Sequence, residues 1–308
     1  MILVVNLNPS LDKIYSVSQL LYGQAVRAVK VQNTAGGKGT HAANVIHILG
    51  EECTVTGFLG GSIGSFIAAE LSKRNIRNEC IPIKAETRAC LNIADANGKQ
   101  TEVLEPGPVI TDEERNAFIL RYKSLLPQCT LVAASGSLPQ NVGKDFYRIL
   151  IELAKDEHKP FLLDTSGIAL QEGIKARPYF IKPNKDETEA LTGRKITSFA
   201  DAVQEVRALQ QQGIELPAIS LGKEGSILAY QDKVYHAIPP KLTAINAVGS
   251  GDAYVAGLAA GLAQSLPITA AIRLASACGT ANVLEAESGF VQKDQVAEII
   301  KHVKIVEL

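Results

Sequence analysis

Residues 246–266 read NAVGSGDAYVAGLAAGLAQSL, in which two glycines flank Ser250, an aspartate follows, and an apolar helix pattern begins. Glycine lets the backbone approach a ligand closely, and the free N–H groups at a helix start attract anions with the help of the helix dipole. A carboxylate beside an anion site is electrostatically unfavourable unless it has a chemical task. The stretch therefore predicts that Gly249, Ser250, Gly251 and Asp252 bring an anion and a proton acceptor together.

Outward from this stretch, short apolar runs alternate with helical patterns along the chain. Strands are expected at 2–7, 53–58, 130–134, 160–164, 179–182 and 217–221, and helices at 38–49, 62–75, 111–126, 143–157, 198–212, 250–264, 268–285 and 292–302. Gly50 and Gly213 follow two of these helices, as glycines that end a helix do. Near-continuous apolar strands joined by helices are typical of buried parallel sheets. The sequence predicts an α/β fold with a mostly parallel central sheet and helices on both faces.

Residues 13–33 and 87–105 break this alternation, because their polarity alternates as in strands with one exposed face. Asn97-Gly98, between two such runs, is a strong hairpin signal. Hairpins do not join a parallel sheet easily, and open α/β folds bind ligands at the carboxyl edge of the sheet. We expect the two segments to form a small β-sheet lid over that edge, within a single domain spanning residues 1–308.

Composition narrows the class of protein. The formal net charge of −1 predicts no attraction to nucleic acid or to a membrane surface. The first residues enter a strand without a leader pattern, and no apolar run is long enough to cross a bilayer. The five cysteines include no CxxC pair, which is typical of free thiols in a reducing compartment. We expect a cytoplasmic enzyme.

Two further stretches near the N-terminus carry polar groups after strands. In AGGKGTHAAN (35–44) the glycines permit close backbone approach, and Lys38 adds a positive charge where the turn opens; a tight turn with a solvated lysine explains the pattern equally well. In NPSLD (8–12) the side chains could bind a polyol, although an Asx-type turn after a strand also explains them.

IKPNKDETEAL (181–191) places Asn184 and Glu187 three residues apart at a helix start, on one face. An amide and a carboxylate there could hold the water shell of Mg²⁺, which prefers oxygen ligands and retains several waters. The alternative is a helix start enriched in acidic residues because of the helix dipole. ETRAC (86–90), SGSLP (135–139) and SLGKEGS (220–226) are weaker candidates of the same kind.

Several common sites are absent from the sequence. There is no GxxxxGK[ST] loop, and the glycine pattern around Asp252 lacks the third glycine of GxGxxG, so a dinucleotide dehydrogenase is disfavoured. The histidines and cysteines form no metal-ligand pattern.

GGKG, NxxE and GSGD, each after a strand, together describe phosphoryl transfer. The amides of 249–251 would stabilise charge on the transferring phosphate, and Asp252 would accept the proton of the attacking hydroxyl.

With these motifs in place, the whole chain resembles the phosphofructokinase-B branch of the ribokinase-like sugar kinases. NPSLD, AGGKG, ETR, TEVLEPGP (101–108), SGSLP, LDTSG (163–167), KPNxxE, SLGxxG and NAVGSGD occur in the family's order and approximate spacing. The resemblance implies a ribokinase-like fold and ATP-dependent, Mg²⁺-assisted phosphorylation of a sugar phosphate. The closest match is to members that convert tagatose 6-phosphate into tagatose 1,6-bisphosphate; members that act on fructose 1-phosphate are the alternative.

The resemblance also implies a role for each matching residue. Asp252 would be the base and the amides of Gly249, Ser250 and Gly251 the anion hole. Asp12 and Gly37 would hold sugar hydroxyls. The phosphate already on the sugar would be held by Lys38, Arg88 and Ser137, with Arg27 of the lid as a helper. The nucleotide would be bound by Lys182, Asn184, Ser220, Gly222, Gly225 and Asn282, and the Mg²⁺ would be held through water by Asn184 and Glu187. His41 stands where the family usually has a sugar-binding asparagine, so it is expected to contact the sugar with altered hydroxyl selectivity. Family lids pair between subunits, which implies a homodimer through the lid.

Other functions fit the sequence less well. Ribose and adenosine lack the phosphate that Lys38 and Arg88 would hold. A catalytically idle sugar-phosphate sensor is the non-enzyme alternative. Retention of Asp252 with its glycines, and of Asn184 with Glu187, argues against a sensor.

Overall fold

The computed structural model describes all 308 residues and contains a main sheet of eleven strands. These strands are β1 (Ile2–Asn6), β4 (Cys53–Gly60), β5 (Arg77–Asn78), β6 (Ile81–Ile83), β9 (Leu131–Ser135), β10 (Phe161–Asp164), β11 (Phe180–Ile181), β12 (Leu216–Ser220), β13 (Ser226–Tyr230), β14 (Lys233–Ile238) and β15 (Lys304–Glu307). Their order is β15-β14-β13-β12-β11-β10-β9-β1-β4-β5, with β6 also beside β4. Strands β5 to β12 along this path are parallel, and β12 to β15 are antiparallel. The predicted mostly parallel sheet is confirmed.

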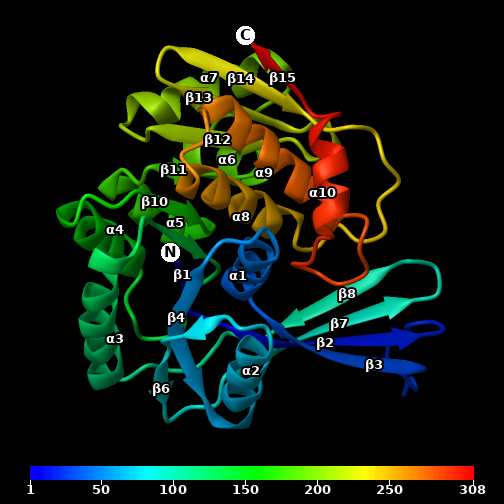
Figure 1. Cartoon of the computed structure of the whole chain (residues 1–308). Helices are drawn as coiled ribbons and strands as arrows, with labels where there is room; N and C mark the ends of the chain where they lie inside the picture. The colour runs from blue at the N-terminus through cyan, green and yellow to red at the C-terminus, as the bar shows by residue number, and fades with distance from the viewer.

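Helices cover both faces of the sheet (Figure 1). One face packs against α1 (Lys38–Ile48), α2 (Gly61–Lys73), α8 (Ser250–Ala263), α9 (Ile268–Asn282) and α10 (Lys293–Ile300), and the other against α3 (Asp112–Leu125), α4 (Phe146–Asp156), α5 (Gly167–Gly173), α6 (Lys185–Thr192) and α7 (Phe199–Gln211). Strand β1 shows why: Ile2 and Val4 enter one core, and Leu3 and Val5 the other. Burying each such side chain contributes about 1.5–3 kcal/mol, so both faces of the strand must be apolar.

A second sheet of four strands forms the lid, in the order β3-β2-β7-β8. Its strands are β2 (Ser10–Val17), β3 (Lys30–Gly36), β7 (Arg88–Asp95) and β8 (Gln100–Leu104). The β7–β8 hairpin turns at Gly98 with a φ of 78°, as the Asn-Gly pair predicts. In Figure 1 the four strands project together away from the main sheet. The predicted small lid sheet is confirmed, although its first segment extends from Ser10 to Gly36 rather than from 13 to 33.

Some boundaries and elements differ from the sequence prediction. Helix α9 ends at Asn282 rather than 285, because the Asn282 amide bonds the carbonyls of Glu287 and Phe290 and the chain turns back there. Helix α4 starts at Phe146 rather than 143, because Gly143 has a φ of 94° that a helix does not allow. The short helix α5 and the strands β5, β6, β14 and β15 were not predicted. No helix of the structure combines the length and the apolar character needed to span a membrane.

Candidate active site

The lid and the carboxyl edge of the parallel strands enclose a cleft of about 570 Å³. Ligands bind at this edge in open α/β sheets. Most of the predicted site residues line the cleft: Asp12, Gly37, Lys38, His41, Arg88, Ser137, Lys182, Asn184, Glu187, Ser220, Gly249, Gly251 and Asp252. The fold therefore brings together residues that are up to about 240 positions apart in the sequence.

The start of α8 forms an anion site. Gly249 precedes the helix with a φ of 86°, and a Cβ there would lie 2.6 Å from the backbone nitrogen of Gly289, so only glycine fits. The first helical hydrogen bond runs from Ala253 N to Gly249 O, and the N–H groups before it have no acceptor within the helix. A Cβ on Gly251 would be 3.3 Å from Lys182 Nζ, so a buried ammonium group adjoins these amides. Amides, helix dipole and ammonium all favour a negative ligand.

Asp252 lies in the first turn of the same helix and is buried at the floor of the cleft. Its Oδ2 atom lies 2.9 Å from Nδ1 of His41, and Oδ1 has no hydrogen-bond partner within the chain. One carboxylate oxygen is therefore fixed and the other is available to accept a proton. A proton acceptor next to an anion site is the arrangement that the sequence predicts.

Asp164, at the end of β10, is a site residue that the sequence interpretation missed. Its Oδ2 lies 3.4 Å from Lys38 Nζ and its Oδ1 lies 3.6 Å from Lys182 Nζ. Burial alone would raise the pKa of this carboxyl, but the charges of Lys182 and Lys38 outweigh it and lower the pKa. The signal in the sequence was a lone aspartate ending an apolar strand, in the quoted LDTSG.

The position of Lys38 differs from the expected pairing with Arg88. Its ammonium group adjoins Asp164, whose charge raises the pKa of Lys38 against the opposing effect of burial. Lys38 Cβ also approaches Gly136, which keeps the start of α1 close to the end of β9. Lys38 and the buried Lys182 therefore share the Asp164 carboxylate, while the Lys38 side chain stays 45% exposed to the cleft.

Arg88 lies at the lid side of the cleft and is held by backbone oxygens. Its Nε donates to the carbonyl of Asn8 (3.2 Å) and one terminal nitrogen donates to the carbonyl of Glu105 (2.9 Å), which leaves the other terminal nitrogen without a partner. The Asn8 side chain donates to Ser137 Oγ at 3.0 Å. Arg88 and Ser137 are thus joined through Asn8, which the sequence suggested only as one of the possible polyol-binding residues of NPSLD.

His41 and Asp12 lie between the lid and α8. Asp12 Oδ1 accepts from Ser10 Oγ at 2.6 Å, and its Oδ2 lies 3.4 Å from Nε2 of His41. A Cβ on Gly36 would lie 2.1 Å from the Asp12 carboxyl carbon, so this carboxylate packs on bare glycine backbone. Burial opposes the charged imidazole, but the two carboxylates raise the pKa of His41 to about 10. At neutral pH the ring therefore carries an N–H on each nitrogen: Nδ1 donates a hydrogen bond to Asp252, and Nε2 forms an ion pair with Asp12.

Asn184 and Glu187 form a reciprocal capping box at the start of α6. Asn184 Oδ1 accepts from the Glu187 N–H, and Glu187 Oε2 accepts from the Asn184 N–H, both at 2.8 Å. The helix-start interpretation is therefore confirmed, while Glu187 Oε1 still lies in the cleft without a partner. No group of three or more acidic, histidine or cysteine side chains forms a metal cage. These residues fit Mg²⁺ only in the mode that keeps most of its waters.

Five predicted site residues do not line the cleft. Arg27 lies exposed between β2 and β3, and Ser250 contributes backbone at the helix start. Asn282 is buried behind Gly249, where its amide braces the loop after α9. Gly222 and Gly225 form the turn that follows Ser220 at the rim. The direct nucleotide contact of Asn282 and the phosphate contact of Arg27 therefore find no support within one chain.

The comparisons with known proteins agree with this geometry. A model of the pfkB family of carbohydrate kinases matches residues 5–295. A curated tagatose-6-phosphate kinase from Staphylococcus epidermidis is 35% identical, with 100% of both chains covered. A solved structure from Thermotoga maritima, described as a possible 1-phosphofructokinase, is 25% identical with a TM-score of 0.90, covering 100% of this chain and 99% of that one. Phosphofructokinase-2 from Escherichia coli, 24% identical with a TM-score of 0.91 and 98% of each chain covered, shares the fold.

The match runs through the anion site, the lid and the parallel sheet alike, so it covers every part of the cleft. The resemblance found from the motifs is confirmed. The chain belongs to the pfkB family of carbohydrate kinases and is an ATP-dependent sugar kinase.

Proposed function

We propose that the enzyme transfers the γ-phosphoryl group of ATP to the 1-hydroxyl of tagatose 6-phosphate, giving tagatose 1,6-bisphosphate and ADP. The observation that carries the proposal is the buried Asp252, whose free oxygen faces the cleft beside the amides that begin α8. The full-length similarity to a tagatose-6-phosphate kinase supports the choice of sugar.

In the reaction, the sugar hydroxyl oxygen attacks the γ-phosphorus, a new O–P bond forms, and the bond to the β-phosphate oxygen breaks. Asp252 Oδ1 takes the hydroxyl proton as that bond forms. The N–H groups of residues 249–251 and Lys182 Nζ stabilise the charge on the transferring phosphate. Asp164 keeps the two lysines in place without a ligand, so the cations are positioned before ATP arrives.

The phosphate already on the sugar is held at the opposite side, by Arg88 and Ser137. The free terminal nitrogen of Arg88 and the Ser137 hydroxyl, joined through Asn8, suit a phosphate oxygen. Lys38 lies between the two phosphates and assists both, since its ammonium group adjoins Asp164 rather than Arg88. Asp12 and the backbone of Gly37 hold sugar hydroxyls between these ends.

The nucleotide lies along Ser220 and the Gly222–Gly225 turn, which borders the cleft next to Lys182 and Asn184. Glu187 and Asn184 would hold Mg²⁺ through its water shell, and the bound ion would supply positive charge to the ATP phosphates. The free Oε1 of Glu187 supports this role, because the other carboxylate oxygen is used in the helix cap.

Fructose 1-phosphate is the second candidate substrate, giving the 1,6-bisphosphate by transfer to its 6-hydroxyl. Its phosphate and its free terminal hydroxyl lie at the opposite ends of the sugar from those of tagatose 6-phosphate. The similarity to the Thermotoga maritima structure supports fructose 1-phosphate as the alternative substrate. The proposed phosphate site at Arg88 serves either sugar phosphate.

The enzyme works as a homodimer in the cytoplasm, with the lids of two copies facing each other. Exposed apolar side chains on one lid support this: Tyr22, Val29, Val31, Val103 and Leu104. All five cysteines are free, which suits a reducing compartment. The molar mass from light scattering after gel filtration tests the dimer: Val103→Asp should give the monomer mass, and an unchanged mass for both proteins near 33 kDa would rule it out.

The substrate is tested with a coupled ADP-release assay on tagatose 6-phosphate, fructose 6-phosphate, fructose 1-phosphate and ribose. We expect the highest kcat/KM with tagatose 6-phosphate, and ³¹P NMR of the product should show a new phosphate at C1. A higher kcat/KM with fructose 1-phosphate would select the alternative. No sugar-dependent ADP release with any of the four would refute the proposed function.

A further inference from the structure

The imidazole of His41 joins the two carboxylates at the sugar end of the cleft. Nδ1 lies 2.9 Å from Asp252 Oδ2, and Nε2 lies 3.4 Å from Asp12 Oδ2. The three residues come from the start of α8, from β2 of the lid and from α1, and Asp252 is 211 positions from His41 in the sequence. One ring therefore links the lid to the helix that carries the proposed base.

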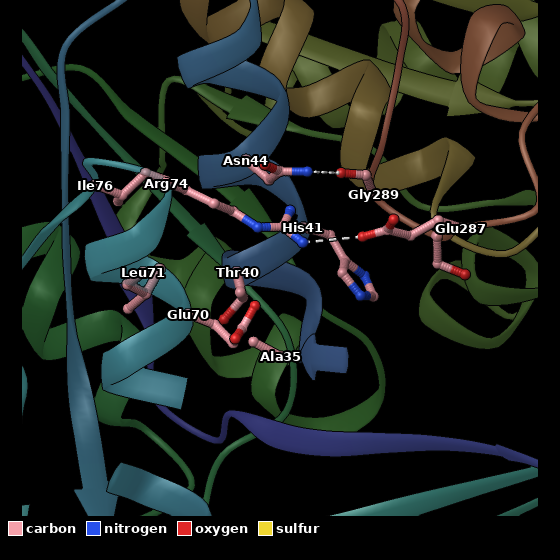
Figure 2. Close-up of a pocket in the computed structure, with 11 residues that line it drawn as sticks. Ala35, Thr40, His41, Asn44, Glu70, Leu71, Arg74, Ile76, Glu287 and Gly289 are labelled. Atoms are coloured by element: carbon pink, nitrogen blue, oxygen red, sulfur yellow. Dashed lines mark hydrogen bonds and ion pairs between the residues drawn. The ribbon is translucent and has the colours of Figure 1, made fainter. Parts of the chain in front are cut away.

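The surroundings of His41 hold it in this place. A Cβ on Gly289 would lie 2.3 Å from His41 Cβ, so the loop after α9 packs directly on the histidine. That loop is tied to α1 by Asn44, which donates to the carbonyl of Gly289 at 2.7 Å, and to α2 by the Arg74–Glu287 ion pair at 3.0 Å; Figure 2 shows both links. The position of the ring is thus set by backbone as well as by its two acceptors.

The charged groups around His41 come from every neighbouring element. Asp12 faces it from β2, Asp252 from α8, and Lys38 begins its own helix. On the other side Glu70 of α2, Arg74 directly after that helix and Glu287 of the loop line the small cavity next to it (Figure 2). Arg74 pairs with Glu287 and Glu70 pairs with Lys73, so the carboxylates of Asp252 and Asp12 dominate the charge around the ring.

We propose that His41 is a positioning residue with two separable tasks: its Nδ1–H fixes the carboxylate of the base Asp252, and its Nε2–H fixes the sugar-holding carboxylate of Asp12. The inference rests on the proposed function and goes beyond it. His41 is not itself a sugar ligand in this arrangement, because both of its nitrogens are engaged with carboxylates. This role gives a function to His41, which stands where the family usually has asparagine.

The negative charge of Asp12 and Asp252 explains why a cation is needed between them. Asp12 and Asp252 would otherwise present two carboxylates to a site that receives two phosphate groups. A doubly protonated imidazole offsets part of that charge and leaves Asp252 Oδ1 free. It also orients that oxygen, because the hydrogen bond to Oδ2 fixes the rotation of the carboxylate.

Two isosteric substitutions separate the two tasks. Asparagine places its amide nitrogen near the position of Nδ1, and glutamine places its amide nitrogen near the position of Nε2. His41→Asn therefore keeps the donor to Asp252 and loses the donor to Asp12, while His41→Gln does the reverse. Losing one charge-assisted hydrogen bond corresponds to about a ten- to hundredfold effect.

We expect His41→Gln to lower kcat about ten- to hundredfold with a small change in the KM of the sugar phosphate. His41→Asn should raise that KM by a similar factor with a smaller loss of kcat. The KM of ATP should stay unchanged in both, which serves as the internal control. Equal losses in both variants, or none in either, would overturn the proposal, since a packing role does not distinguish the two donors.

A measurement without substrate separates this proposal from the proposed function. Imidazole ¹⁵N shifts of the five histidines at pH 8 should show one doubly protonated ring, which disappears in His41→Gln. In Asp252→Asn the same ring should titrate at lower pH than in the wild type. If all five rings are neutral at pH 8, the proposed positioning of Asp252 and Asp12 by His41 is refuted, whatever sugar the enzyme uses. If the His41 ring is doubly protonated but no sugar is phosphorylated, only the proposed function fails.

Discussion

The Nζ atom of Lys182 lies 3.6 Å from Oδ1 of Asp164, and neither side chain is more than 8% exposed. The second oxygen of Asp164 faces Lys38, so one carboxylate keeps two ammonium groups close together. Removing one partner of a buried ion pair leaves an uncompensated charge and costs about 3–5 kcal/mol. This small cluster is the electrostatic centre of the cleft.

Asp164→Asn should therefore lower the free energy of unfolding by about 3 kcal/mol at pH 7, measured by urea denaturation. The folded state lowers the pKa of Asp164 from 3.8, so its contribution is complete above that pH and is lost as the pH falls through the lower folded value. The gap between wild type and variant should narrow there. Asp145→Asn, in a half-exposed pair with Arg148, is the control and should cost less than about 1 kcal/mol. Equal stability of the wild type and Asp164→Asn at pH 7 would contradict the role given to Asp164.

Arg88→Ala should weaken tagatose 6-phosphate while leaving the KM of ATP nearly unchanged. A charge-assisted hydrogen bond contributes about 1.5–3 kcal/mol, so kcat/KM for the sugar phosphate should fall about ten- to more than a hundredfold. Unphosphorylated tagatose gives nothing for Arg88 to hold and should be little affected. Arg88→Lys should recover only part of the loss, because lysine lacks the planar fork. Equal losses for both sugars would mean that Arg88 only supports the lid.

Glu187→Gln should raise the Mg²⁺ concentration that gives half-maximal rate. Glutamine still serves in a capping box, so the helix cap is kept while the carboxylate is removed. Glu114→Gln is the matched control, since Glu114 occupies the same position in the capping box of α3. An identical Mg²⁺ titration for wild type and Glu187→Gln would leave Glu187 as a cap alone.

The contacts of His41 with Asp12 and Asp252 should also affect the pH dependence of stability. The folded state raises the pKa of His41 from 6.5 to about 10, so its contribution is complete below pH 6.5 and is lost as the pH rises towards 10. Over that range the wild type should lose stability faster than His41→Asn, by at most about 1.4 kcal/mol per pH unit. Parallel curves for the two proteins in urea denaturation from pH 6 to 10 would show that the histidine is not held by its carboxylates.

Much of the fold could be predicted because its strands are buried on both faces and its helices carry apolar stripes. The strongest site predictions were those with local causes, such as the glycines before Asp252 and the Asn184–Glu187 pair at a helix start. Asp164 was missed because its importance depends on Lys38, which is 126 positions away in the sequence. The double contact of His41 depends likewise on strand order and lid position, which no short motif encodes.

Two of the predicted residues lie close to the site without lining the cleft of their own chain. Asn282 is adjacent to Gly249 but turns its amide to the loop behind the anion site. Arg27 belongs to the lid but lies in its exposed connection, so within one chain it does not line the cleft. Motif order placed both near the active site, and only the side-chain directions decide what they contact.

The most direct test of the central claim is the kcat of Asp252→Asn with saturating ATP, Mg²⁺ and tagatose 6-phosphate. The substitution keeps the shape of the side chain and removes its ability to take the hydroxyl proton. We expect kcat to fall by about 10²–10⁴, with a much smaller change in KM. Asp294→Asn, in the first turn of α10 and away from the cleft, should turn over like the wild type. Near-normal turnover by Asp252→Asn would contradict the assignment of Asp252 as the base beside the anion site.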